Sequence, residues 1–123
     1  EYSEAVLEHF RNPRGPGRLP AGEPGAVSGE ARHDDGGQRV RLHLCVDDTG
    51  RITRARFQAF GCPITIAVAS AAVARIEGAS VEAALRLGAD ELAIELALQP
   101  EQRPLAELPL AALRSALAYL RAP

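Results

Sequence analysis

The sequence predicts an α+β protein, with a small antiparallel β-sheet of about three strands and helices packed on one face of it. Residues 3–11 have helical spacing of apolar side chains, residues 26–60 hold alternating segments joined by short turns, and residues 64–120 return to helical spacing. A run of strands between helical segments is typical of the α+β class. The 123 residues are enough for one core, and we expect a single domain over residues 1–123.

The first helix is expected over Ser3–Arg11. Its apolar side chains share one helical face, Ser3 is a suitable N-cap, and Pro13 would end the helix. Residues 12–25 are rich in proline and glycine, which predicts a loop.

Three strands should follow this loop. Ala26–Ala31 is expected to form a short strand, and residues 38–46 alternate between apolar side chains on one face and Arg, His and Cys on the other. The segment Asp47–Gly50 is a suitable hairpin turn, since Gly50 tolerates a positive φ. Arg51–Phe60 is then the returning strand.

The register of this hairpin follows from matching the apolar faces of its strands. Pairing Val46 with Arg51 achieves the match, so that paired residue numbers sum to 97. Cys45 then lies roughly 30 Å from Cys62 along the strand. A disulfide needs Cα atoms within about 7 Å, so we expect no bond between these two cysteines in one chain.

The same register places Cys62 level with Asp35. The polar loop that contains His33, Asp34 and Asp35 should therefore face the Cys62 thiol. Thiolate, imidazole and carboxylate are the ligands that a divalent transition metal uses. Cys62, His33 and Asp35, with Asp34 as a substitute, are the candidate metal ligands. The alternative is a small buried cysteine beside an ordinary turn.

The rest of the chain is expected to be helical. A helix apolar almost all round should be buried, and the glycine that follows it suits a C-terminal cap. The expected helices are Ile64–Glu77, Val81–Arg86, Asp90–Leu98 and a final amphipathic helix from Leu108 or Leu110 to Leu120.

Cys62 also stands at the start of the buried helix. Pro63 is suited to the first helical position, which makes Cys62 the N-cap. The helix dipole favours an anion there by about 0.3–1 kcal/mol, and cysteines at helix N-termini tend to be reactive. Cys62 is therefore a candidate nucleophile as well as a candidate ligand.

The remaining polar residues are more ordinary. His9 and His43 are expected at the surface, as is Cys45, which faces outward beside His43. Four arginines form a basic outer face of the sheet, which would be a solvated surface or a docking site for an acidic partner. These are Arg39, Arg41, Arg54 and Arg56.

Composition excludes several classes of protein. The formal net charge is −2, which argues against binding nucleic acid through phosphate neutralisation. The sequence has no apolar stretch of about 18 residues, so we expect no membrane helix. The N-terminal residues do not have the pattern of a signal peptide. We therefore expect a cytoplasmic protein with reduced thiols.

Several segments together resemble the IscU/NifU N-terminal family of iron–sulfur cluster assembly scaffolds, over essentially the whole chain. The segments that carry the resemblance are Tyr2-Ser3-Glu4, Asn12-Pro13-Arg14, Asp48-Thr49-Gly50 with Ile52, Ala55-Arg56-Phe57, Phe60-Gly61-Cys62, Gly78 with Ser80, Glu82-Ala83 and Ala112–Leu120. The resemblance implies the family's α+β fold and a role as scaffold or carrier rather than enzyme.

The chain departs from the family at the site itself. Cluster-building members have three cysteines, with an aspartate two residues after the first and a histidine before the third. Cys62 matches the middle cysteine. Gly36 stands at the position of the first cysteine and Gln38 at that of the aspartate. Leu105 stands at the position of the third cysteine and Pro104 at that of the histidine. The segment Leu98–Gln102 lacks the lysine of the family's chaperone-recognition motif, which argues against handover to those chaperones.

Three functions remain open under this resemblance. The first is a divergent scaffold that binds iron or an iron–sulfur cluster weakly through Cys62, with zinc as a substitute in isolation. The second is a sulfur relay in which Cys62 accepts a persulfide from a cysteine desulfurase, the partner that the resemblance implies. The third is a module that binds no metal and regulates the desulfurase by docking to it.

Overall fold

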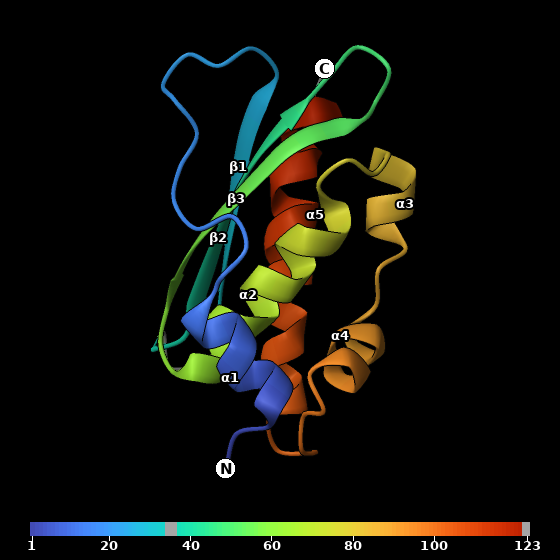
Figure 1. Ribbon diagram of the computed structural model, residues 1–123. Helices are drawn as coiled ribbons and strands as arrows, with labels where there is room; N and C mark the ends of the chain where they lie inside the picture. The colour runs from blue at the N-terminus through green and yellow to red at the C-terminus, as the bar shows by residue number, and fades with distance from the viewer. Residues whose placement is uncertain (34–36, 122–123) are drawn as a thin grey trace.

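The computed structural model describes residues 1–33 and 37–121. It has a three-stranded antiparallel sheet of order β1–β2–β3, with α2 and α5 lying across one face (Figure 1). The predicted α+β class is confirmed. The elements are α1 (Glu4–Arg11), β1 (Ala26–Arg32), β2 (Arg39–Val46), β3 (Ile52–Phe60), α2 (Pro63–Ile76), α3 (Val81–Leu85), α4 (Ala89–Glu95), the 3₁₀ helix η1 (Arg103–Ala106) and α5 (Glu107–Arg121).

The main core lies between the inner face of the sheet and helices α2 and α5. Val40, Leu42 and Leu44 of β2 are fully buried there, as their alternation predicted. Helix α5 approaches β1 closely at Gly29, where a Cβ atom would collide with the backbone of Ala112 and Ala116. The glycine therefore allows the helix to lie directly on the strand.

A second core lies on the other side of α2. Small side chains of α2 pack there against α1, α4 and η1, and the fully buried Leu92 and Leu96 contribute from α4 and its end. Because α2 is enclosed by both cores, it is apolar almost all round, and its predicted burial is confirmed. None of the helices that the described residues form is both long enough and apolar enough to cross a membrane.

The predicted hairpin register is wrong by one residue at Val46 and by two residues beyond it. Val46 pairs with Ile52, and beyond an irregularity Leu42 pairs with Phe57, so paired residue numbers sum to 98 and then to 99. The connection between the strands is one residue longer than predicted, over residues 47–51. Within it Gly50 has a φ of +84° and Asp47 N–H donates to Arg51 O across the turn. The second shift comes from Thr53, an extra residue that bulges from β3.

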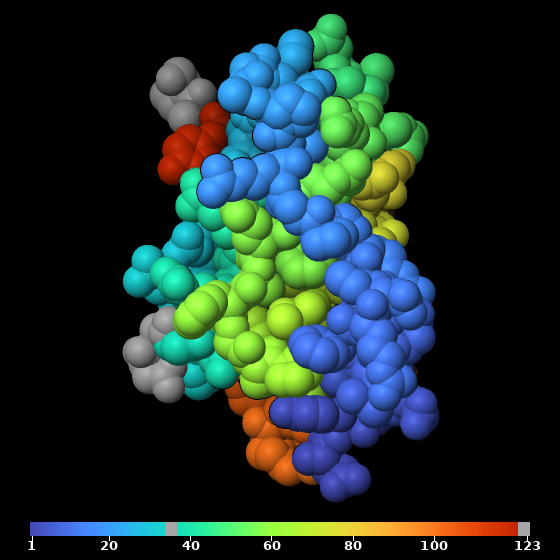
Figure 2. All heavy atoms as spheres, turned by 60° about the vertical axis from the view of Figure 1, so that its left-hand side comes forward, coloured from blue at the N-terminus to red at the C-terminus, as the bar shows by residue number. Residues whose placement is uncertain are grey.

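The outer face of the sheet is partly covered by residues 12–25. This segment runs along the free edge of β3, where Phe57 N–H donates to Gly15 O and Gly17 N–H donates to Phe57 O, both at 2.8 Å. It then reaches β2, where Val46 N–H donates to Gly25 O at 3.0 Å. Figure 2 shows the segment crossing one end of this face, with β2 and β3 open to view at the other.

Two predictions of surface residues on this face are wrong. Cys45 is 4% exposed and His43 is 9% exposed, although both face outward from β2. His43 is enclosed by hydrogen bonds to Ser28 Oγ at 2.7 Å and to Gln58 Oε1 at 2.9 Å. Strand alternation gives the direction of a side chain but not what covers it.

His9 was also predicted at the surface and is buried. Its Nδ1 lies 2.7 Å from Ser70 Oγ on α2, and its Nε2 lies 3.5 Å from Glu95. Burial lowers the pKa of His9, and the nearby Arg14 lowers it further, against the raising effect of Glu95. His9 is thus an internal contact between α1 and α2 rather than a surface residue.

Candidate functional site

Cys62 lies where β3 ends and α2 begins. Gly61 makes the connection with a φ of +137°, and Cys62 follows as the N-cap residue, with Pro63 in the first helical turn. The predicted N-cap position is confirmed. The thiol is half-buried, and its Sγ lies 3.9 Å from Thr65 Oγ1. Cys62 is therefore a partly exposed residue whose sulfur has a polar neighbour within the same helical turn.

Gln38 holds this turn in place from β2's side of the sheet. Its Oε1 accepts the backbone N–H of Cys62 at 3.0 Å and also accepts the hydroxyl hydrogen of the fully buried Thr65. The carboxamide packs so closely that a Cβ atom on Gly61 would collide with it. Gln38 thus satisfies one of the free N–H groups at the start of α2.

Neither Gln38 nor Thr65 was predicted to contact Cys62. The resemblance marked Gln38 only as the position of a lost aspartate, and Thr65 looked like part of an apolar helix. A signal was present for Thr65, since it follows the N-cap by three residues, the spacing of first-turn contacts. For Gln38 the signal was the pairing of β2 with β3, because the correct register brings Gln38 close to the turn at Cys62. The predicted register was wrong by two residues there.

The corrected register changes which residues face Cys62. Continuing the pairing of Arg39 with Phe60 brings Cys62 level with residue 37 rather than with Asp35. His33 is half-buried, and its backbone N–H donates to Gln38 O at 2.9 Å. The backbone of His33 is therefore bonded to the residue whose side chain contacts Cys62. Asp34 and Asp35 lie outside the described residues. Their joint role with Cys62 stays a prediction.

The described residues do not form a complete ligand set for a cluster. A [2Fe–2S] centre takes four ligands, mostly thiolates. Within residues 1–33 and 37–121, no three His, Cys, Asp or Glu side chains are grouped closely enough to bind one metal ion. Leu105 packs against the same second core as Cys62, where its hydrocarbon side chain has no donor atom to offer. The described side chains alone therefore do not supply the ligands of a whole cluster.

The two cysteines are separate thiols, as predicted. Burial raises the pKa of the Cys45 thiol, and Glu23 raises it further. Arg54, which pairs with Glu23 at 3.1 Å, lies beside it in the sheet. Cys45 is therefore held as a neutral thiol away from the Cys62 site.

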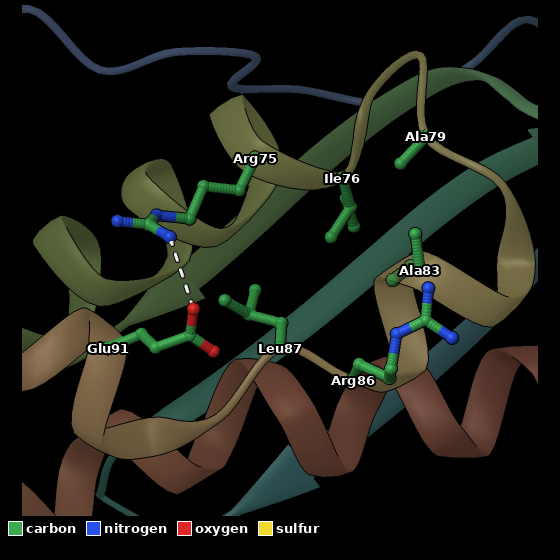
Figure 3. Close-up of a pocket in the computed structure, with 8 residues that line it drawn as sticks. Arg75, Ile76, Ala79, Ala83, Arg86, Leu87 and Glu91 are labelled. Atoms are coloured by element: carbon green, nitrogen blue, oxygen red, sulfur yellow. Dashed lines mark ion pairs between the residues drawn. The ribbon is translucent and has the colours of Figure 1, made fainter.

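A hollow at the opposite end of α2 is a distinct feature. It is bounded by the end of α2, by α3 and by the start of α4, with Ile76 and Leu87 among its apolar lining. Figure 3 shows Arg75 and Glu91 facing each other across it, joined by an ion pair of 3.7 Å. This hollow has no thiol or imidazole in its lining, so it adds nothing to the chemistry of Cys62.

Comparisons with known proteins found a matching family and similar sequences. The model of the NifU-like N terminal domain family matches residues 1–122. The iron-sulfur cluster assembly scaffold protein IscU of Azotobacter vinelandii is 35% identical over 99 residues, covering 80% of this chain and 77% of the relative. IscU of Haemophilus influenzae is 32% identical over 121 residues, covering 98% of this chain and 96% of the relative.

Solved structures agree on the fold. A scaffold protein for the SUF system from Fervidobacterium islandicum, described as putative, superposes with a TM-score of 0.76 at 19% identity, covering 94% of this chain and 96% of the other. The N-terminal NifU-like protein from Brucella abortus gives a TM-score of 0.77 at 19% identity, covering 97% and 93%. At this identity the likeness concerns the fold alone.

Proposed function

We propose that this chain, which belongs to the NifU-like N-terminal domain family, is a divergent scaffold-like protein of iron–sulfur cluster assembly that holds iron or a cluster weakly through Cys62. The supporting observation is the position of Cys62, a half-exposed thiol at the N-cap of α2. The relatives named above carry the description of assembly scaffold proteins. We extend that role to this chain, with weaker binding through a single cysteine.

The binding is weak because the chain supplies few donor atoms. The side-chain oxygen of Gln38 already accepts a hydrogen bond at the start of α2, and the side chains of Leu105 and Pro104 have no donor atom for a metal ion. Cys62 with His33, and with Asp35 or Asp34 from the adjoining loop, would hold an iron or zinc ion with fewer ligands than a closed tetrahedral site. A cluster would need further thiolates from a second chain or from small thiols in solution.

Anaerobic purification tests this proposal directly. Iron, zinc and acid-labile sulfide are measured on the native chain, on Cys62→Ser and on Cys45→Ser, before and after incubation with iron and sulfide. We expect bound metal in the native chain and in Cys45→Ser, and its loss in Cys62→Ser. Cys45→Ser is the matched control, because it removes a thiol of the same chain from a buried place. A native chain that stays free of metal after reconstitution contradicts the proposal.

Transfer of sulfur is the second candidate function, and the surroundings of Cys62 favour it. One accessible thiolate is enough for this chemistry, whereas the residues around it are poor ligands. The Cys62 thiolate would attack the terminal sulfur of a persulfide on a cysteine desulfurase. A new S–S bond forms at Cys62 as the S–S bond of the donor breaks, and the donor cysteine leaves as a thiolate.

Mass spectrometry separates the two candidates. After incubation with a cysteine desulfurase and free cysteine, sulfur transfer predicts a gain of one sulfur atom on Cys62 in metal-free buffer, in the native chain and in Cys45→Ser. Binding of metal without this gain supports the scaffold-like function instead. Binding of the desulfurase with neither metal nor sulfur on Cys62 contradicts both and leaves the docking module.

A further inference from the structure

We propose that the open half of the outer sheet face, formed by Arg32, Arg39, Arg41 and Phe60, docks an acidic segment of the protein that exchanges sulfur with Cys62. This inference rests on the proposed role of Cys62 in iron–sulfur cluster assembly. It adds the surface and the chemistry of the partner, neither of which follows from the thiol alone.

The pairing of the three strands arranges the outer face in rows. One row is Ala26, Cys45 and Arg54, and the next is Ser28, His43 and Arg56. In these two rows the middle side chains are buried, and Glu23 of segment 12–25 pairs with Arg54. This half of the face is therefore already occupied by the chain itself.

The other two rows are open. One is Glu30, Arg41 and Gln58, and the last is Arg32, Arg39 and Phe60. Phe60 is 60% exposed, although it is a large apolar side chain. A hollow on this part of the face is lined by Glu30, Arg39, Arg41, Gln58, Ala59 and Phe60. An exposed aromatic ring beside an arginine combines two residue types that are enriched at protein interfaces.

The side chains of this open half are already held in position. The guanidinium of Arg39 lies over the ring of Phe60, 4.9 Å from its centroid. Glu30 accepts hydrogen bonds from Arg32 at 2.9 Å and from Arg41 at 3.2 Å. A partner would therefore meet a surface that loses little side-chain entropy on binding.

Charge selects the chemistry of the partner. The four charged side chains of these rows are three arginines and one glutamate, a net charge of +2, on a chain whose formal net charge is −2. The net charge of the open rows is thus opposite in sign to the net charge of the whole chain. A segment with two or more carboxylates beside an apolar residue complements the arginines and the Phe60 ring.

Position relates this surface to Cys62. The last row ends at Phe60, two residues before Cys62, and Gly61 turns the chain directly from one to the other. A partner bound on Arg39 and Phe60 would have its next residues within reach of the thiol. Docking and transfer would then occur on the same protein without release between them.

Titration calorimetry with the purified cysteine desulfurase of the same genome tests the inference. The variants are Arg39→Glu and Phe60→Ala, with Arg86→Glu as the control, because Arg86 is exposed at the C-cap of α3 and undergoes the same charge change. We expect each of the first two to weaken binding by about tenfold or more. Arg86→Glu should bind like the native chain, and salt should weaken native binding more than that of Arg39→Glu.

Several results would overturn the inference. They are equal affinity of Arg39→Glu and the native chain, an equal loss in Arg86→Glu, and no binding of the desulfurase at all. Binding of a single-stranded oligonucleotide that is tighter than binding of the desulfurase, and lost in Arg39→Glu, would assign the surface to nucleic acid. Cys62→Ser keeps the failures distinct, since it should bind the desulfurase normally even though it loses metal or sulfur.

Discussion

The two cysteines lie toward opposite ends of the same sheet and differ in their burial and in what surrounds each thiol. Cys45 is 4% exposed, and the pKa of its thiol is raised by burial and by Glu23. Cys62 is half-exposed at the start of α2, where backbone N–H groups point toward the N-cap. The difference is due to what covers each end. Segment 12–25 crosses the Cys45 end, and the side chain of Gln38, just before β2, reaches the turn at Cys62.

This contrast shows how one residue type acquires two roles. The cover over Cys45 makes it part of the packing. The turn at Cys62 leaves the sulfur accessible and places it beside the open arginine rows. Reactivity therefore follows from the loop that crosses the sheet as much as from the strand that carries the cysteine.

Alkylation of the native protein should give the largest difference between the two ends. With iodoacetamide under native conditions, we expect Cys62 to react at least about a hundredfold faster than Cys45, because a thiolate must form and meet the reagent before it reacts. Peptide mass spectrometry at timed intervals measures both rates. In denaturant the two rates should converge, and similar native rates would show that the contrast does not exist in solution.

Opening the cover over Cys45 is the second prediction. Gly25 has a φ of +74°, and a Cβ atom there would collide with the Val46 carbonyl. We expect Gly25→Ala to lower the free energy of unfolding by about 2–3 kcal/mol, from backbone strain and overpacking, and to speed native alkylation of Cys45. Urea denaturation and the same alkylation assay measure these effects.

Gly22→Ala is the matched control for this change. Gly22 also has a positive φ, of +78°, but nothing lies within 4 Å of its Cβ position. Only backbone strain remains, which costs about 1 kcal/mol, and Cys45 should stay protected. Equal effects of the two substitutions would mean that the contact between Gly25 and Val46 does not hold the cover.

Sequence reasoning succeeded where a pattern is local. The apolar α2, its cap at Cys62 and the alternation of Val40, Leu42 and Leu44 are all written in neighbouring residues. It failed where a contact joins distant segments. Thr53 is an extra residue in the pairing of β3 with β2, and a single extra residue moves the partner of every position beyond it.

The same distinction applies to the site. The position of Cys62 was predictable, because Pro63 and the apolar run after it mark a helix start. Its contact with Gln38 was not, because it joins residues 24 apart and required the correct register. The burial of Cys45 required the path of residues 12–25, which contain no periodic pattern. Loops rich in glycine and proline leave their course to tertiary contacts.

Removing Gln38 is the third prediction and the smallest effect, and it tests the Cys62 end. Gln38→Leu deprives the Cys62 N–H and the buried Thr65 hydroxyl of their acceptor. We expect a loss of about 1–2 kcal/mol in the free energy of unfolding, since a buried hydroxyl without a partner is costly. Urea denaturation measures it.

The double variant Gln38→Leu with Thr65→Val sharpens the test, because it removes the hydroxyl together with its acceptor. Replacing both partners by apolar groups is often nearly neutral, so the double variant should recover part of the stability lost in Gln38→Leu. Simple addition of the two single losses would mean that Gln38 and Thr65 act independently. Recovery would show that the Cys62 end depends on one hydrogen-bonded contact, as the Cys45 end depends on the close approach of Gly25.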